Sequence, residues 1–166
     1  MTSSSTQRAS SSTCIRNSYH VFLSFRGEDT RKNFTDHLYT ALVAYGIQVF
    51  RDDEELEKGG DIASDLSRAI EESKIFIIIF SKNYANSRWC LNELVKIIEQ
   101  MEEKKSMVLP VFYHVNPSDV RKQSGIYEEA FSNHEAGANQ GKERTKNWRS
   151  ALRKAADLSG YHVDSQ

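Results

Sequence analysis

A tryptophan and a glutamate four residues apart, Trp89 and Glu93, are the side chains of this sequence best suited to chemistry. They follow an apolar run, Ile75 to Phe80, and a short polar segment that begins at Ser81. In a helix that starts after this segment, residues four apart lie side by side on one face. If the core stripe of this helix is Leu91, Leu94, Val95 and Ile98, at ~100° per residue, Trp89 and Glu93 are predicted to point away from the core.

A single carboxylate is sufficient for only some of the reactions that cleave a glycosidic bond. Glycosidases normally use two carboxyl groups, one of which protonates the leaving oxygen. One is enough when the leaving group departs without a proton, as nicotinamide does from the ribose of NAD. Glu93 would then stabilise an oxocarbenium-like ribose and hold its hydroxyl groups, while Trp89 offers a stacking surface. The competing interpretation is that Glu93 is a solvated residue on a helix surface.

A second polar segment, Arg26 to Arg31, follows the first predicted strand. Gly27 allows a close backbone approach, and the N–H groups of the next helix, with two flanking arginines, suit a diphosphate. The alternative is a helix start capped by Asp29 or Thr30, with both arginines solvated. The segment contains no GxGxxG fingerprint, so a Rossmann mode of dinucleotide binding is not supported.

Other candidate sites are weaker. Asp52 and Asp53 resemble the acidic pair of a phosphorelay receiver, but the third strand is followed by Ser81 instead of an acid. An acidic loop with glycine hinges is favoured there, and such a loop could act as a lid. His37 is interpreted as a surface or interface residue. The sequence has no HExxH, CxxC or GxSxG motif, so neither a metal site nor acyl-transfer chemistry is expected.

Length and composition indicate one globular domain. The chain has 166 residues and a net charge of −1, which gives no general attraction to nucleic acid or to an anionic membrane. No apolar run is long enough to span a bilayer. Two cysteines form no disulfide framework, which favours a reducing cytoplasmic or nuclear setting. Residues 1–17 are rich in Ser and Thr and are predicted to be a disordered leader.

Strand-like and helix-like segments alternate along the chain. This pattern predicts an α/β fold with a doubly wound parallel sheet and helices on both faces. The site is then expected beyond the carboxyl ends of the strands, where the loops at 26–31, 51–60 and 81–89 converge. Pro110 suggests an edge position or a bulge in the fourth strand. The predicted strands are Tyr19 to Phe25, Ile47 to Phe50, Ile75 to Phe80 and Met107 to Tyr113, and the main helices start near Arg31, Asp61, Trp89 and Glu143.

Five motifs in order identify a family resemblance. Together they resemble the plant TIR domain, which opens nucleotide-binding, leucine-rich-repeat disease-resistance proteins. The resemblance covers residues 18–161 and leaves 162–166 as the start of a linker. The motifs are VFLSFRGEDTR with the following HLY and AL, FRDD with KG, AIEESK, SRWCLNEL, and VFYHVNPSDVRKQSG.

The resemblance implies a flavodoxin-like sheet of about five strands, so a short fifth strand is expected near Ala136 to Gly141. It also implies cleavage of NAD or NADP as a substrate, with no prosthetic cofactor and with Glu93 as the catalytic residue. The loop from Asp52 to Gly60 would gate the site, with Lys58 where the family commonly has Arg. Residues implied to lie near the substrate are Arg26, Gly27, Glu28, Asp29, Thr30, Arg31, Gly59 and Trp89.

Self-association is the second implication of the resemblance. His37 on the first helix is expected to pack against the last helix of a partner, which carries Trp148. A head-to-tail contact through the loop from Asp52 to Gly60 would extend the assembly. The partners are copies of this chain or other TIR domains, and the output is a signal for plant immunity and cell death. The alternative is a non-catalytic module that signals by homotypic contact, with Glu93 a surface residue.

Overall fold

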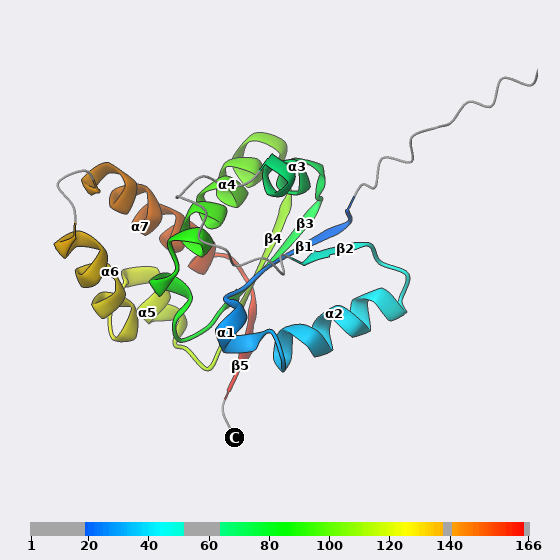
Figure 1. Ribbon diagram of the computed structural model, residues 1–166, viewed down its shortest axis with the longest axis horizontal. Coiled ribbons are helices and arrows are strands. Elements are labelled where there is room, and N and C mark those ends of the chain that lie inside the picture. The colour runs from blue at the N-terminus through cyan, green and yellow to red at the C-terminus, as the bar shows by residue number, and fades with distance from the viewer. Residues whose placement is uncertain (1–18, 52–63, 138–140, 165–166) are drawn as a thin grey trace, which may run out of the picture.

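The computed structural model describes residues 19–51, 64–137 and 141–164. Within these ranges, five parallel strands form one sheet in the order β2-β1-β3-β4-β5 (Figure 1). The expected leader and the loop at 52–60, with Gly59, lie outside the described residues. The strands are β1 (Val21–Ser24), β2 (Val49–Arg51), β3 (Ile75–Phe80), β4 (Met107–Tyr113) and β5 (Tyr161–Val163).

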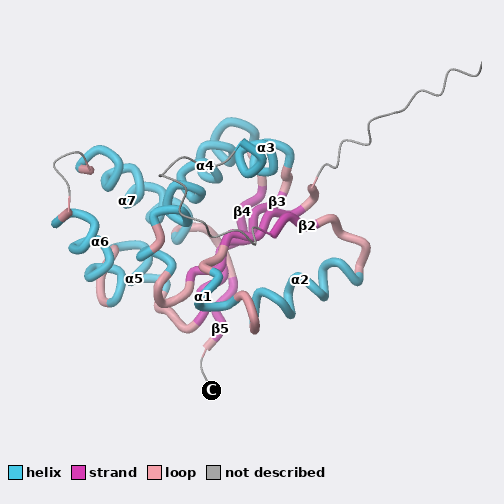
Figure 2. Tube along the Cα trace, in the orientation of Figure 1, coloured by secondary structure: helices cyan, strands magenta, loops and turns pink. Residues whose placement is uncertain are grey.

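Helices cover both faces of the sheet, as the alternating pattern predicted. Helix α2 lies on one face, and α3 and α4 lie on the other, with α7 beside α4 (Figures 1 and 2). This arrangement, with the strand order, gives the flavodoxin-like fold. The helices are α1 (Gly27–Thr30), α2 (Phe34–Ala44), α3 (Ser64–Glu72), the 3-10 turn η1 (Tyr84–Asn86), α4 (Arg88–Lys104), α5 (Pro117–Lys122), α6 (Ile126–Ala136) and α7 (Lys142–Ala156).

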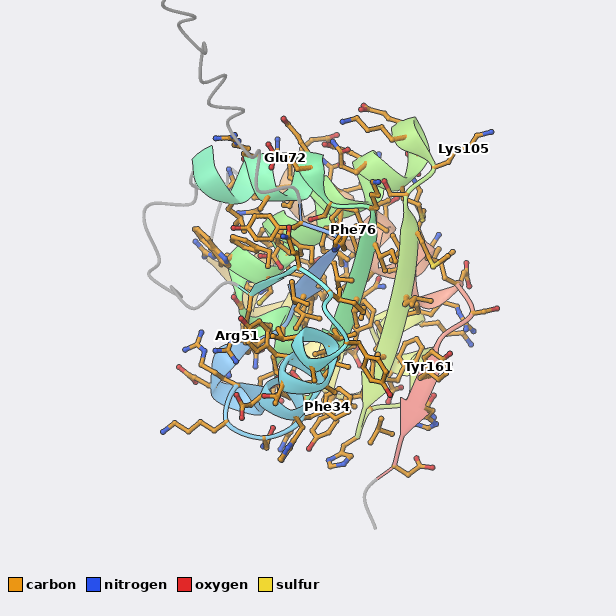
Figure 3. The ribbon with its side chains drawn as sticks, turned by 90° about the vertical axis from the view of Figure 1, so that its right-hand side faces the viewer. Phe34, Arg51, Glu72, Phe76, Lys105 and Tyr161 are labelled. Carbon is orange, nitrogen blue, oxygen red and sulfur yellow. The ribbon has the colours of Figure 1, made fainter. Side chains whose placement is uncertain are left out.

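Strand β3 separates two apolar cores. Phe76, Ile78 and Phe80 face the larger core beneath α3, α4 and α7, whereas Ile77 and Ile79 face the smaller core beneath α2. Because both faces of the strand are covered, its sequence is apolar throughout instead of alternating. Figure 3 shows Phe76 within the sheet and Phe34 of α2 on the side of the smaller core.

The fifth strand corrects two expectations from the sequence. It follows α7 as Tyr161–Val163, whereas the region near Ala136 that was expected to contain it ends helix α6. β5 pairs in parallel with β4, so β4 is interior and the edge position expected from Pro110 is wrong. The ladder between β4 and β5 begins one residue after the proline, at Val111. β5 is a three-residue strand at the edge of the sheet, and its Tyr161 is 68% exposed (Figure 3). Such a strand contains no apolar run from which the sequence could predict it.

Substituting Gly160 with alanine is expected to displace β5. A Cβ atom at this position would lie 2.1 Å from the carbonyl oxygen of Pro110, which is backbone and cannot rotate away. We expect the free energy of unfolding in urea to fall by about 2 kcal/mol or more, within the range of overpacked interiors. Gly137→Ala is the matched control, because its nearest atom lies at 3.9 Å. Equal stability of the two variants would contradict the prediction.

Candidate active site

The segment after β1 and the segment after β3 meet at the side chain of Asp29. The hydroxyl of Ser81 donates to Asp29 Oδ2 at 2.6 Å, and the backbone N–H of Asn83 donates to the same oxygen at 2.9 Å. The side-chain amide of Asn83 donates to Oδ1 at 3.2 Å. These bonds join residues more than fifty positions apart and confirm that two of the three expected loops converge. The third loop lies outside the described residues.

Arg26 completes the hydrogen bonding around Asp29. Its guanidinium donates to Asp29 Oδ1 at 3.0 Å and pairs with Glu28 Oε2 at 3.0 Å. Burial by itself would raise the pKa of Asp29, but bonds from Ser81 and Asn83, with the charge of Arg26, bring it below its ordinary value. Burial opposes the charge of Arg26, and the two carboxylates still raise the pKa of its guanidinium. Asp29 therefore holds two loops together as an ionised carboxylate.

The remaining residues of the 26–31 segment have different positions. Gly27 and Thr30 are buried in the short helix α1, whereas the Glu28 side chain is 75% exposed. Thr30 bonds the hydroxyl of Thr35 at 2.7 Å. The following helix α2 is capped by Asn33, whose side chain accepts a hydrogen bond from Phe34 N–H at 2.6 Å, so the alternative in which Asp29 or Thr30 caps that helix is wrong.

Asp29→Asn is expected to destabilise the domain in a pH-dependent way. Because the folded-state pKa of Asp29 is lowered, the ionised carboxylate contributes stability above its unfolded-state pKa, and that contribution is lost as the pH falls through the folded-state pKa. We expect a loss of about 1–3 kcal/mol near pH 7 that shrinks below about pH 4. Urea unfolding of both proteins at several pH values measures the difference. A loss that is constant with pH would contradict this assignment.

Glu93 lies inside the molecule and does not point away from the core. Its exposed fraction is 3%, and Trp89 is half-buried against the larger core. The predicted outward direction is wrong because a stripe analysis assumes one covered face. Helix α4 contacts α3, α7, η1, β1 and β4, so its buried arc is wide. The buried residues of α4 are Cys90, Leu91, Glu93, Leu94, Ile97 and Ile98.

The first turn of α4 is fixed to the end of β1. Ser87 caps the helix by accepting a hydrogen bond from Cys90 N–H at 3.1 Å. The thiol of Cys90 points to the carbonyl oxygen of Phe25 at 3.5 Å. The buried hydroxyl of Tyr84 donates to the carbonyl of Cys90 at 3.3 Å. Burial of the phenol raises the pKa of Tyr84 most, and the charges of Cys90 and then of Glu93 raise it further, so Glu93 lies near this hydroxyl.

Sequence reasoning missed Ser81, Asn83 and Tyr84 as residues that organise the site. Each makes hydrogen bonds to the chain around β1. The available signal was their place in the polar segment directly after a buried strand, where parallel sheets hold their ligand sites.

The two residues predicted to mediate self-association differ in exposure. His37 is exposed on α2, as expected for an interface. Trp148 is buried, with 3% of its surface exposed, and its indole N–H donates to Asn92 Oδ1 at 3.0 Å. The ring also packs edge-on to His134, with centroids 5.1 Å apart. Trp148 therefore joins α7 to α4 within the chain, so this side chain is not on the exposed surface of α7.

Neither a metal-binding cluster nor a membrane-spanning helix occurs in the described ranges. No group of three or more His, Cys, Asp or Glu side chains in these ranges is arranged to hold a metal ion. None of the helices described combines the length and apolar composition that a bilayer-spanning segment needs.

Comparison with known proteins places the chain in a family. A model of the TIR domain matches residues 18–166. The chain is 54% identical over 168 residues to the disease resistance protein RPV1 of Vitis rotundifolia, covering 98% of this chain and 12% of that protein. It is 54% identical over 152 residues to the TMV resistance protein N of Nicotiana glutinosa, covering 92% of this chain and 13% of that protein. It thus spans about an eighth of the length of these relatives.

A solved structure agrees with the sequence comparison. The TIR domains in the structure of the activated Roq1 resistosome, which directly recognises the pathogen effector XopQ, match with a TM-score of 0.80 and 52% identity, covering 87% of each chain. The family model covers nearly all of the chain, and the resistance proteins are similar over the same region. The chain belongs to the TIR domain family and is closely related to the TIR domains of plant disease-resistance proteins.

Proposed function

We propose that this domain, when self-associated, cleaves NAD or NADP at the nicotinamide–ribose bond and so produces a nucleotide signal for plant immunity and cell death. The observation that carries the proposal is the position of Glu93. Glu93 is 3% exposed, on a helix whose first turn is hydrogen-bonded to the carboxyl end of β1. Parallel sheets hold their ligand sites at the carboxyl ends of their strands, so a buried carboxyl group beside such an end favours a chemical role.

The proposed reaction needs one carboxylate and no acid. Nicotinamide leaves with the electron pair of the glycosidic bond, which neutralises its pyridinium nitrogen, so no proton transfer to the leaving group is required. The ribose carbon develops oxocarbenium character, which the carboxylate of Glu93 stabilises at short range. Water then attacks this carbon, giving ADP-ribose and one proton; attack by an adenine nitrogen of the same molecule would give a cyclic product.

The other substrate contacts are proposed on residues near Glu93 and on the segment around Asp29. Trp89 is half-buried one helical turn before Glu93 and offers a ring surface for stacking. Gly27, Glu28 and Arg31 lie on the segment that Asp29 holds against Ser81 and Asn83. Arg26 and Asp29 already bond each other, so we assign them to shaping this segment. Gly59 stays a proposed contact on the loop outside the described residues.

Self-association is proposed because related TIR domains occur in an activated resistosome. The proposed surfaces are the exposed face of α2 with His37, the last helix α7 of a partner, and the loop at 52–60. Other TIR domains are possible partners. The proposed location is the cytoplasm or the nucleus, because the two cysteines form no disulfide framework.

The test of this function is nicotinamide release by the purified domain. NAD and NADP are incubated separately with the domain over a wide range of protein concentrations, and nicotinamide is quantified by chromatography. We expect release to rise more steeply than the protein concentration, because assembly precedes chemistry. If neither substrate is cleaved at the highest concentration, while sedimentation shows that the domain has assembled, the domain is a non-catalytic interaction module.

His37→Ala is expected to weaken self-association without unfolding the domain. The side chain is exposed on α2, so its removal leaves no cavity in the core. We expect the concentration needed for half-assembly, measured by sedimentation, to rise by about tenfold, as for a central interface residue. Lys96→Ala, an exposed change on α4, serves as the control. Unchanged sedimentation of the His37 variant would exclude this residue from the interface.

A further inference from the structure

A buried chain of hydroxyl groups connects β1 to the helix that carries Glu93. Ser24, at the end of β1, lies 2.8 Å from the hydroxyl of Tyr84, and both side chains are fully buried. The Tyr84 hydroxyl donates in turn to the carbonyl of Cys90 at 3.3 Å. Because the phenol has a single proton, this places Ser24 as the donor to Tyr84. The chain therefore runs in one direction, from strand to helix.

The role of Tyr84 is not explained by packing alone. Its ring packs edge-on to Phe80 in the larger core, with centroids 5.1 Å apart, and a phenylalanine would fill the same space. The hydroxyl is the part that reaches α4, and it contacts the first turn, three residues before Glu93. Burial, with the neighbouring Cys90 and Glu93, raises the pKa of Tyr84 well above its ordinary value. The phenol therefore remains a hydrogen-bond donor at neutral pH.

We propose that Tyr84 is a positioning residue, whose hydroxyl anchors the first turn of α4 to β1 and thereby fixes the carboxylate of Glu93. This proposal rests on the proposed function in one respect only, namely that the position of the Glu93 carboxylate affects the reaction. The anchoring has a readout of its own, because the thiol of Cys90 lies in the same turn and is 1% exposed. A thiol reagent reaches it only when this turn opens.

The experiment measures alkylation of Cys90 in a background that carries Cys14→Ser, which leaves one thiol in the chain. Tyr84→Phe removes the anchoring hydroxyl and keeps the ring. We expect alkylation by iodoacetamide to be about five to ten times faster, as for loss of one buried hydrogen bond. Ser24→Ala, which removes the donor to Tyr84, is expected to give a smaller increase in the same direction. The Ser24→Ala variant keeps the test decisive if Tyr84→Phe does not fold.

Tyr127→Phe is the matched control. Tyr127 is also fully buried, and its hydroxyl donates at 2.8 Å to the carbonyl of Ser81, on the loop before α4. We expect its alkylation rate to stay within about twofold of the parent, because no hydrogen bond of α4 is removed. Rates for Tyr84→Phe and Ser24→Ala equal to that of the parent would overturn the proposal, as would equal acceleration by Tyr127→Phe.

The kinetics of the Tyr84→Phe variant distinguish a positioning role of Tyr84 from a general effect on stability. For Tyr84→Phe we expect kcat for nicotinamide release to fall about tenfold with KM within about twofold, because misplacing the carboxylate affects the transition state more than binding. An unchanged kcat would overturn the link from the anchor to Glu93. If the parent domain releases no nicotinamide, the proposed function fails, and the alkylation rates alone decide whether Tyr84 anchors α4.

Discussion

Glu93→Gln is expected to lower nicotinamide release by at least about 100-fold, the usual effect of removing an electrostatic group that stabilises charge in a transition state. The substitution keeps the size and shape of a side chain that is 3% exposed, removes its negative charge, and replaces one acceptor oxygen with an NH2 donor. The oxocarbenium-like ribose then develops positive charge with no carboxylate beside it. The loss should appear in kcat more than in KM, since the charge exists only in the transition state.

The control for this variant lies on the same helix. Glu99→Gln changes an exposed glutamate of α4 and should leave nicotinamide release within about twofold of the parent, as for a neutral surface change. Thermal unfolding of both variants, followed by circular dichroism, separates lost chemistry from lost structure. A folded Glu93→Gln variant that releases nicotinamide at the parental rate would remove Glu93 from the reaction. The homotypic interaction module would then be the better interpretation of this domain.

The elements with clear hydrophobic patterns were predictable from sequence. β3 and β4 have the bounds that their apolar runs indicated, because a strand covered on both faces leaves an unbroken signal. β5 was missed because a short strand at the sheet edge buries too little to leave such a pattern. It was then expected before the last helix, where α6 in fact ends at Ala136. A local pattern identifies elements and does not give their order in a sheet.

The sequence predicted which segments form the site, but it did not predict the contacts between their side chains. The segments that contain Asp29, Ser81 and Glu93 could be chosen because each follows or flanks a predicted strand. Their contacts could not, because the bonds to Asp29 join residues 52 and 54 positions apart. The burial of Glu93 was missed for a related reason. The periodicity of α4 shows which residues share a face, whereas the number of covered faces depends on α7, far along the chain.

Trp148→Ala is expected to cause the largest loss of stability among the changes considered. The side chain is 3% exposed in the larger core, and truncating it removes the apolar contacts that join α7 to α4. Large-to-small substitutions of buried tryptophan cost about 3–5 kcal/mol, a large share of the ~5–15 kcal/mol that stabilises a typical domain. Urea unfolding measures the loss, with Asn147→Ala, an exposed change on the same helix, as the control.

Trp148→Phe separates the two contributions of this side chain. Phenylalanine keeps most of the apolar contact and removes the indole N–H that donates to Asn92 at 3.0 Å. A loss of about 1–2 kcal/mol is expected, because the buried indole no longer donates a hydrogen bond to Asn92. Asn92 directly precedes Glu93, so both variants should also lower nicotinamide release when compared at temperatures where each is folded. Stability of Trp148→Ala within about 1 kcal/mol of the parent would show that α7 is held to α4 by other contacts.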